Sequence, residues 1–288
     1  MTIQEEHLEA ALDILADTTS GASAVSRKIL RYFRDVLNNN NIPIDTVVRM
    51  AFSFIKTHST LGQVINICLD LVEALEEKRM DPKDVASQIE SYETVLDGST
   101  AKAILYFREL VDRPLTILTL SKSSMVTASL RVADPQPYVI IGESRPNLEG
   151  VVLAKELGRA GIPVTLVADA VLPSMADSAD MALVGCDAIM DDFFYNKVGT
   201  YPLALACQEH NIPMYVLATL DKVIREERKS YFALSGRPAV ELCANPPPGV
   251  SITNYHFEKA SLDCVKCIIS ELGILEPQKF LEIALSKP

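Results

Sequence analysis

Hydrophobic residues in the first third of the chain recur at intervals of three and four, which is the spacing of one face of an amphipathic helix. The run over residues 30–37 is one example. Residues 81–82, Asp-Pro, supply an N-cap and a first-turn proline for a helix over 83–96. The Asp-Gly pair at 97–98 predicts the end of that helix, and Ser99 is positioned to cap the next.

The pattern changes after residue 114, where short apolar runs begin to alternate with helical segments. The runs are continuously apolar, as expected of strands buried on both faces, and cover residues 115–120, 138–141, 164–168, 182–185 and 214–218. The helical segments between them cover residues 125–132, 149–160, 173–178 and 200–210. This alternation predicts an α/β fold in which a helical domain (1–112) precedes a parallel-sheet domain (113–288). The tail, 262–285, is expected to form two helices separated at Pro277.

The composition of the chain limits the kinds of molecule that we expect it to bind. The chain has 288 residues, a net charge of −11 and a pI near 4.9, so no basic face for direct nucleic-acid binding is expected. No apolar run reaches the length of a membrane span, and the acidic opening segment does not resemble a signal peptide. We therefore expect a cytoplasmic protein with no membrane partner.

Six cysteines are expected to be free, mostly buried thiols in a reducing compartment. Cys264 and Cys267 form a CxxC pair in a segment predicted to be helical. Because no second pair or neighbouring histidine supports a zinc site, the structural interpretation is favoured over a redox or metal role. No metal or cofactor is predicted.

Polar residues follow each of the predicted strands. Because the carboxyl ends of parallel strands meet at one edge of a sheet, where ligands of open α/β folds bind, these residues are candidates for one site. They are Ser121, Ser123, Arg145, Asp169, Asp187 and Thr219, with Asn196 and Lys197 just before a predicted helix.

Each of these groups has a role if the ligand is a phosphorylated sugar. The segment 121–124 precedes a helix, whose free N–H groups attract an anion. Arg145 would hold a phosphate through two parallel hydrogen bonds, Lys197 would add positive charge, and Asn196 would bind a hydroxyl. Asp187 would orient sugar hydroxyls or exchange protons as a general acid–base.

The same residues have structural alternatives. Asp187 can cap a turn, the serines of 121–124 can cap the following helix, and Arg145 can pair with Glu143 or Glu149. The chain lacks both the GxGxxG fingerprint of dinucleotide sites and the GxxxxGK[ST] phosphate loop. Its four histidines are scattered and are not expected to be catalytic.

Several ordered segments resemble motifs of one known family. Residues 142–150 resemble its ESRPxxEG signature, 184–189 its VGADAI segment and 196–200 its NKxGT segment. Residues 254–257 and 269–273 resemble its NPxFD and ITExG ending. The chain is thus similar to the superfamily of the alpha, beta and delta subunits of translation initiation factor 2B, which also contains ribose-1,5-bisphosphate isomerase and methylthioribose-1-phosphate isomerase.

The resemblance implies an N-terminal helical domain on a Rossmann-like domain, dimers or higher homo-oligomers, and a sugar-phosphate pocket between the domains. It places Gly21 and Ala22, within the segment 20–23, near the ligand. The isomerases carry a catalytic Cys and Asp. The Asp corresponds to Asp187, whereas Ser121 stands at the position of the Cys, and a hydroxyl is far less acidic than a thiol.

Three interpretations of function follow. The first is an initiation factor 2B-like regulatory protein that binds a sugar phosphate or nucleotide and has initiation factor subunits as partners. The second is an aldose–ketose isomerase of a sugar 1-phosphate, with Asp187 as the main acid–base group and Ser121 assisting. The third is a scaffold that only oligomerises. The sequence identifies neither the ligand, the oligomer size nor the protein partner.

Overall fold

The structure is a computed structural model that describes residues 3–39 and 42–286. Its first part is helical, as predicted, and comprises α1 (Ile3–Ala16), α2 (Ala22–Leu37), α3 (Ile44–Thr57), α4 (Gly62–Val72), a π-helical turn (Glu73–Glu77) and α5 (Pro82–Leu110). The apolar faces of these helices pack into one core that includes Val25, Phe33 and Phe54, none of which is exposed.

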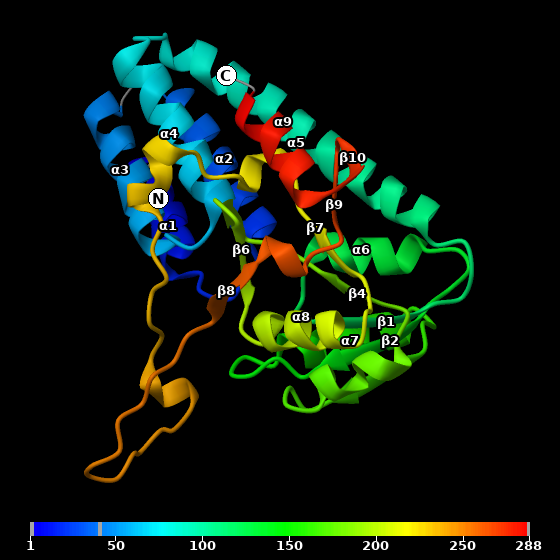
Figure 1. Ribbon diagram of the computed structural model, residues 1–288. Coiled ribbons are helices and arrows are strands. Elements are labelled where there is room, and N and C mark those ends of the chain that lie inside the picture. Colours follow the sequence, from blue (N-terminus) through cyan, green and yellow to red (C-terminus); the bar gives the residue numbers. More distant parts are fainter. Residues whose placement is uncertain (1–2, 40–41, 287–288) are drawn as a thin grey trace.

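Helix α5 is continuous, so the predicted break at 97–98 is wrong. Asp81 does cap the helix, accepting a hydrogen bond from the Lys83 N–H at 2.9 Å. The first half of α5 packs into the helical core through Ile89, and the second half packs against the large sheet through Phe107. Packing at both ends outweighs the helix-propensity cost of Gly98, about 1 kcal/mol. Figure 1 shows α5 running from the helical part across to the sheet.

The second part contains a seven-stranded sheet in the order β10-β9-β7-β4-β1-β2-β3, in which β10 is antiparallel and the other pairings are parallel. Its strands are β1 (Thr116–Leu120), β2 (Tyr138–Gly142), β3 (Val164–Val167), β4 (Met181–Val184), β7 (Met214–Leu217), β9 (Cys267–Ser270) and β10 (Gly273–Leu275). The five strands predicted from apolar runs are therefore confirmed.

Helices cover both faces of this sheet, which explains the continuous apolar strands. One face packs against α5, α6 (Ser124–Val132) and α7 (Glu149–Arg159). The other packs against a 3-10 helix (Leu172–Ser178), α8 (Thr200–Glu209) and α9 (Pro277–Ser286). After β3 the chain crosses to the other side of β1 to form β4, so the strand order reverses between β1 and β4.

A small antiparallel sheet, which the sequence analysis did not predict, lies between the two parts. It consists of β5 (Ala188–Met190), β6 (Phe193–Lys197) and β8 (Phe257–Ser261). Successive residues of β5 face different cores: Ala188 and Met190 pack with the helical core, whereas Ile189 packs with a core of the large sheet. This alternation fastens the helical part to the sheet directly beside the strand ends.

The tail differs from the prediction in its first half. Residues 267–270 form strand β9, which pairs with β7, and a 3-10 turn (Leu262–Cys264) precedes it. Cys264 thus ends this turn and Cys267 begins the strand, so the CxxC pair does not lie in an α-helix. The helix after Pro277 is confirmed as α9. Of the cysteines, Cys68, Cys186 and Cys207 are buried, and none of the six is in a disulfide.

Among the described residues, every helix is too short or too polar to cross a membrane. The division of the chain at residues 112–113 stays a prediction.

Candidate functional site

The reversal of strand order between β1 and β4 brings two predicted segments together. In doubly wound sheets a crevice opens at this point, outside the carboxyl ends of the strands. An ideal Cβ on Gly185, after β4, would lie 2.8 Å from the Ser123 side chain, after β1, and 3.9 Å from the Asn196 amide oxygen. Ser123, Gly185 and Asn196 are therefore neighbours, as the prediction of a shared site requires.

Asp187 is held by contacts to both parts of the molecule. Its N–H donates to the Tyr195 carbonyl at 2.8 Å, and its carbonyl accepts from the Gly62 N–H at the start of α4, also at 2.8 Å. Burial raises the pKa of the Asp187 carboxyl to about 6, although the ammonium groups of Lys222 and Lys197 favour the ionised form. The carboxyl therefore titrates close to neutral pH, which suits proton exchange.

Two buried lysines lie around this carboxyl. Lys197 is 3% exposed, and its ammonium group lies 2.8 Å from Glu149 Oε1 at the start of α7. The other Glu149 oxygen is buried and has no hydrogen-bond partner among the described residues. Lys222 is 4% exposed and donates to the Cys186 carbonyl at 2.6 Å. A buried ammonium group is costly to desolvate, so two of them here mark a site that attracts anions.

Ser121 is the first residue after β1 and has a left-handed backbone, with φ of 61°. Its N–H donates to the Ser144 hydroxyl at 2.7 Å. Ser144 is also left-handed, and the Asp169 carboxylate accepts from the Ser144 and Arg145 N–H groups at 2.6 and 2.7 Å. Non-glycine residues in this conformation are strained and cluster at functional sites. Asp169 therefore organises the loop that carries Arg145.

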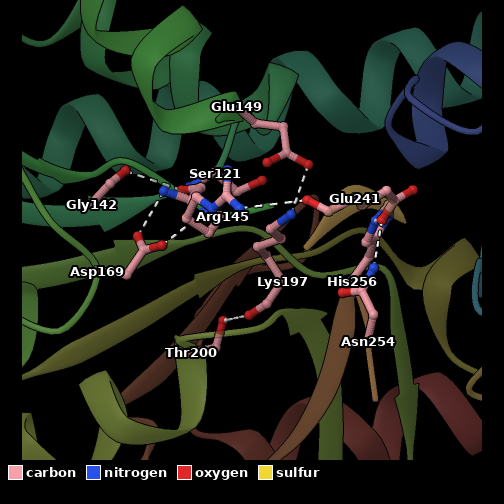
Figure 2. A network of polar contacts seen from close by, with 11 residues as sticks. Ser121, Gly142, Arg145, Glu149, Asp169, Lys197, Thr200, Glu241, Asn254 and His256 are labelled. Carbon is pink, nitrogen blue, oxygen red and sulfur yellow. Dashed lines mark hydrogen bonds and ion pairs between the residues drawn. The ribbon is translucent and has the colours of Figure 1, made fainter. Parts of the chain in front are cut away.

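Arg145 is exposed and directed toward a long segment between the 3-10 turn ending at Tyr231 and strand β8. Its guanidinium donates a weak hydrogen bond of 3.5 Å to the Glu241 carbonyl. The Glu241 carboxylate in turn accepts from His256 and Asn254, each at 2.6 Å. Figure 2 shows Glu241 between Arg145 and His256, with Lys197 turned toward Glu149. Lys197, rather than Arg145, is thus the ion-pair partner of Glu149.

The N-termini of the two helices near the site, α6 and α8, are capped by different side chains. At α6, the Ser123 hydroxyl accepts from the Val126 N–H at 3.4 Å, so the serine cap anticipated from sequence is present. At α8, the Glu258 carboxylate accepts from the Gly199 and Tyr201 N–H groups at 2.7 and 2.8 Å. A carboxylate therefore already occupies the N-terminus of α8, which leaves the lysines and Arg145 as the groups that would contact an anion.

Gly21 and Ala22 lie at the start of α2. Gly21 is exposed and its carbonyl accepts from the N–H groups of Ala24 and Val25, inside the helical part. The contacts described above do not include these two residues, so their place near a ligand stays a prediction.

Sequence reasoning missed three groups of this site: Lys222, Glu149 as the partner of Lys197, and Glu241 with its two donors. Lys222 stands five residues after β7, so an inspection of the polar residues after each strand would have found it if extended beyond Thr219. The Glu241 contacts depend on a long excursion of the chain, for which the sequence offers no local signal. Within residues 3–39 and 42–286, no group of three or more His, Cys, Asp or Glu is arranged to hold a metal ion.

A helical part fastened to a doubly wound parallel sheet, with polar residues where the strand order reverses, defines a Rossmann-like α/β protein with a helical N-terminal part. The chain belongs to the initiation factor 2 subunit family, whose model matches residues 17–277. The superfamily resemblance found in the sequence motifs is therefore confirmed.

The relatives in this family include a protein named as initiation factor-like and an isomerase. A Pyrococcus furiosus protein, named provisionally as a translation initiation factor eIF-2B subunit 2-like protein, is 35% identical over 175 residues. That match covers 59% of this chain and 61% of the relative, so the chain spans about three-fifths of that protein. The ribose 1,5-bisphosphate isomerase of Archaeoglobus fulgidus is 27% identical over 292 residues, covering 95% of this chain and 91% of the enzyme.

A solved structure supports the fold over nearly the whole chain. The crystal structure of the Pyrococcus horikoshii translation initiation factor eIF-2B has a TM-score of 0.79 and 26% sequence identity, and the match covers 96% of this chain and 98% of that one. The crystal structure of 5-methylthioribose 1-phosphate isomerase from the same organism, with a TM-score of 0.74 and 22% identity over 96% of this chain and 88% of that one, has the same fold.

Proposed function

We propose that the protein binds a phosphorylated sugar or nucleotide at the carboxyl ends of β1 and β4 and acts as an initiation factor 2B-like regulatory protein. In this proposal Lys197, Lys222 and Arg145 hold the phosphate. Asn196 and Ser123 contact the sugar, and Gly21 and Ala22 approach it from the helical part.

The observation that carries the proposal is the pair of buried lysines beside a carboxyl of raised pKa. Lys197 is balanced by Glu149, but the hydrogen bond of Lys222 goes to a neutral carbonyl. The Asp187 carboxyl interacts electrostatically with Lys222 and, with its pKa raised by burial to about 6, is mostly ionised at pH 7. Arg145, whose guanidinium donates to the neutral Glu241 carbonyl, adds a positive charge that a phosphate would neutralise.

The thiols of the chain favour binding over catalysis. Ser121 offers a hydroxyl in place of a thiol, and the nearest cysteine in sequence to Asp187 is Cys186. Burial raises the pKa of the Cys186 thiol to about 12, and its Sγ donates to the Ala188 carbonyl at 3.2 Å. A thiol of this kind supplies no thiolate near neutral pH, so it does not replace the thiol of the isomerases.

Titration calorimetry with ribose 1,5-bisphosphate and with AMP tests the binding. We expect saturable binding of at least one of them, weakened about tenfold or more in Lys222→Met, since a buried charged partner is lost. Lys279→Met is the matched control, because Lys279 is an exposed lysine of α9 that pairs with Glu282. Absence of binding to both compounds, or equal weakening in both variants, would contradict the proposal.

The second candidate is an aldose–ketose isomerase, which the raised pKa of Asp187 favours. A carboxyl that titrates near neutrality is suited to move a proton between adjacent sugar carbons. Incubation with ribose 1,5-bisphosphate, followed by proton NMR, would then show a ketose product that Asp187→Asn does not form. A ketose product from both the wild type and the variant would exclude Asp187 as the acid–base group. If neither protein forms the product, the isomerase candidate is excluded and the regulatory function is retained.

The proposed partners are other initiation factor subunits and further copies of this chain. Sedimentation velocity of the protein alone, and then with initiation factor 2, measures both associations. A protein that sediments as a monomer alone and is unchanged when initiation factor 2 is added would argue against a regulatory complex.

A further inference from the structure

The helical part contains a cavity that the proposed function does not use. Its volume is about 230 Å³, and it lies between α2, α4 and α5. Its floor is apolar and buried, formed by Leu30, Phe33, Ile67, Leu71, Ala74, Val85 and Ile89. Small-molecule sites are concave and mostly apolar, with a few polar groups that orient the ligand. The cavity has this character.

The polar groups of the cavity are Asp70, Gln88 and Tyr92. Asp70 and Gln88 are exposed at the mouth, and Tyr92 is half-buried. Burial raises the pKa of the Tyr92 phenol well above its ordinary value, and the negative charges of Asp221 and Asp70 raise it further. The phenol is therefore neutral and faces a negative field.

Asp221, which contributes to this field, is itself unusual. Both carboxylate oxygens of Asp221 are buried, and neither has a hydrogen-bond partner in the described part of the chain. Arg228 binds Asp70 at 2.5 Å and lies 3.8 Å from Glu73, whose carboxylate also pairs with Lys78 at 2.9 Å. A buried carboxylate without a donor is unusual, because such groups are almost always paired. Arg228 and Lys78 stand against the carboxylates of Asp70, Glu73 and Asp221, so the excess negative charge beside the cavity is that of Asp221.

The volume limits the occupant to a small molecule. An engineered apolar cavity of about 150 Å³ binds benzene, so about 230 Å³ holds roughly ten non-hydrogen atoms. A helix or an extended peptide is too large. The π-helical turn that follows α4 places Ala74 in the wall, and such turns occur frequently at functional sites.

We propose that this cavity is a second ligand site, for a small aromatic molecule that carries a positively charged amine. The ring would lie on the apolar floor, with the amine at the mouth beside Asp70. Gln88 and Tyr92 would accept its remaining hydrogen bonds.

The site is connected to the sheet edge by hydrogen bonds. Arg228 donates to Asn66 Oδ1 at 3.1 Å, and the Asn66 amide donates to the carbonyls of Asp221 and Val223 at 2.8 and 2.9 Å. Lys222 lies between these two residues, and its ammonium group donates to the carbonyl of Cys186, the residue before Asp187. An amine at Asp70 competes with Arg228, so occupancy of the cavity is expected to change the affinity at Lys222, with an equal and reciprocal effect.

Indole and tryptamine are suitable probes, because the chain contains no tryptophan and the indole emission comes from the probe alone. We expect saturable binding of both, with a blue-shifted emission. Asp70→Asn should weaken tryptamine about threefold to fivefold, the range of an exposed ion pair, and indole less than about twofold. Glu76→Gln, an exposed carboxylate in the adjoining turn, is the matched control and should change neither.

Substitutions that fill the cavity test whether the probes bind inside it. Ala74→Phe should weaken both probes about tenfold or more, and Val85→Ile is a milder filler if the first variant unfolds. In the wild type, nuclear Overhauser contacts from indole to the Leu71 and Val85 methyls report the site without any substitution. Absence of saturable binding, or binding without these contacts, would overturn the proposal. These measurements need no sugar phosphate, so they stand apart from the proposed function.

Discussion

Replacing Asp187 with asparagine should make the protein more stable at neutral pH, although it removes a central residue of the proposed site. The carboxyl and the amide have nearly the same shape, so the contacts of the Asp187 backbone to Tyr195 and Gly62 should persist. What changes is the charge. Burial raises the pKa of this carboxyl to about 6, and the unfolded chain returns it to an ordinary value of about 3.8.

The size and sign of the effect follow from these two values. The folded state binds the proton more tightly, so the free energy of unfolding falls as the pH rises from about 4 to about 6. The difference between about 6 and 3.8, at about 1.4 kcal/mol for each pH unit, corresponds to about 3 kcal/mol. Asparagine carries no such penalty. The variant should therefore equal the wild type near pH 4 and exceed it by up to about 3 kcal/mol above pH 6.5.

Urea unfolding between pH 4 and 8 measures this difference, at low protein concentration because the pI is near 4.9. Asp112→Asn is the matched control, since Asp112 is exposed. It should stay within about 0.5 kcal/mol of the wild type at every pH. A variant of Asp187 that is less stable than the wild type above pH 6.5, or a difference that does not depend on pH, would refute the reasoning.

Three further predictions concern single contacts. Gly150→Ala should lower the free energy of unfolding by more than about 3 kcal/mol, since its Cβ would lie 1.8 Å from the Gly142 carbonyl oxygen. Gly158→Ala in the same helix, where nothing lies within 4 Å, should raise it by about 0.5–1 kcal/mol, and equal effects in urea unfolding would contradict this. Glu258→Gln should destabilise the protein by about 1 kcal/mol, because its carboxylate caps α8; a loss that does not fall with added salt would argue against a charge effect. Asn66→Ala should cost about 2–3 kcal/mol in thermal unfolding and also weaken sugar-phosphate binding in calorimetry, because the asparagine holds the backbone on both sides of the buried lysine after β7. Unchanged affinity would separate this asparagine from the site.

The sheet was predictable because its strands are buried on both faces and read as continuous apolar runs. The same property explains the error in the tail. Residues 267–270 are as apolar as a buried helix segment, and only their pairing with β7 distinguishes them as a strand. Helix α5 shows the reverse case. Its Asp-Gly pair at 97–98 is a local stop signal, but the helix is long enough to pack against two cores, and long-range packing decides its length.

The residues of the candidate site likewise include some that the sequence predicts and some that depend on long-range contacts. Ser121, Arg145 and Asp187 follow strands directly, so the rule that strand ends converge found them. Lys197 was found too, but its environment depends on β6, a strand of the small sheet that has no signal of its own in the apolar pattern. The sequence thus predicts which residues lie at the strand ends, but it does not predict which charged side chains surround each of them.

Lys222 shows why this distinction matters for function. In the sequence it is one of many lysines, in a turn after a strand. In the structure it is 4% exposed, Asn66 holds the backbone on both sides of it, and its charge acts on the Asp187 carboxyl, whose pKa is raised by burial. An ammonium group in such a place has lost much of its hydration, and a neighbouring anion partly compensates that loss. Asp187 and an incoming phosphate are alternatives for that role, so the protonation of Asp187 and the affinity for phosphate should be linked. Phosphate binding should ease protonation of Asp187. The number of protons taken up, measured by calorimetry in two buffers of different ionisation enthalpy, should therefore be greatest just above the free pKa of about 6.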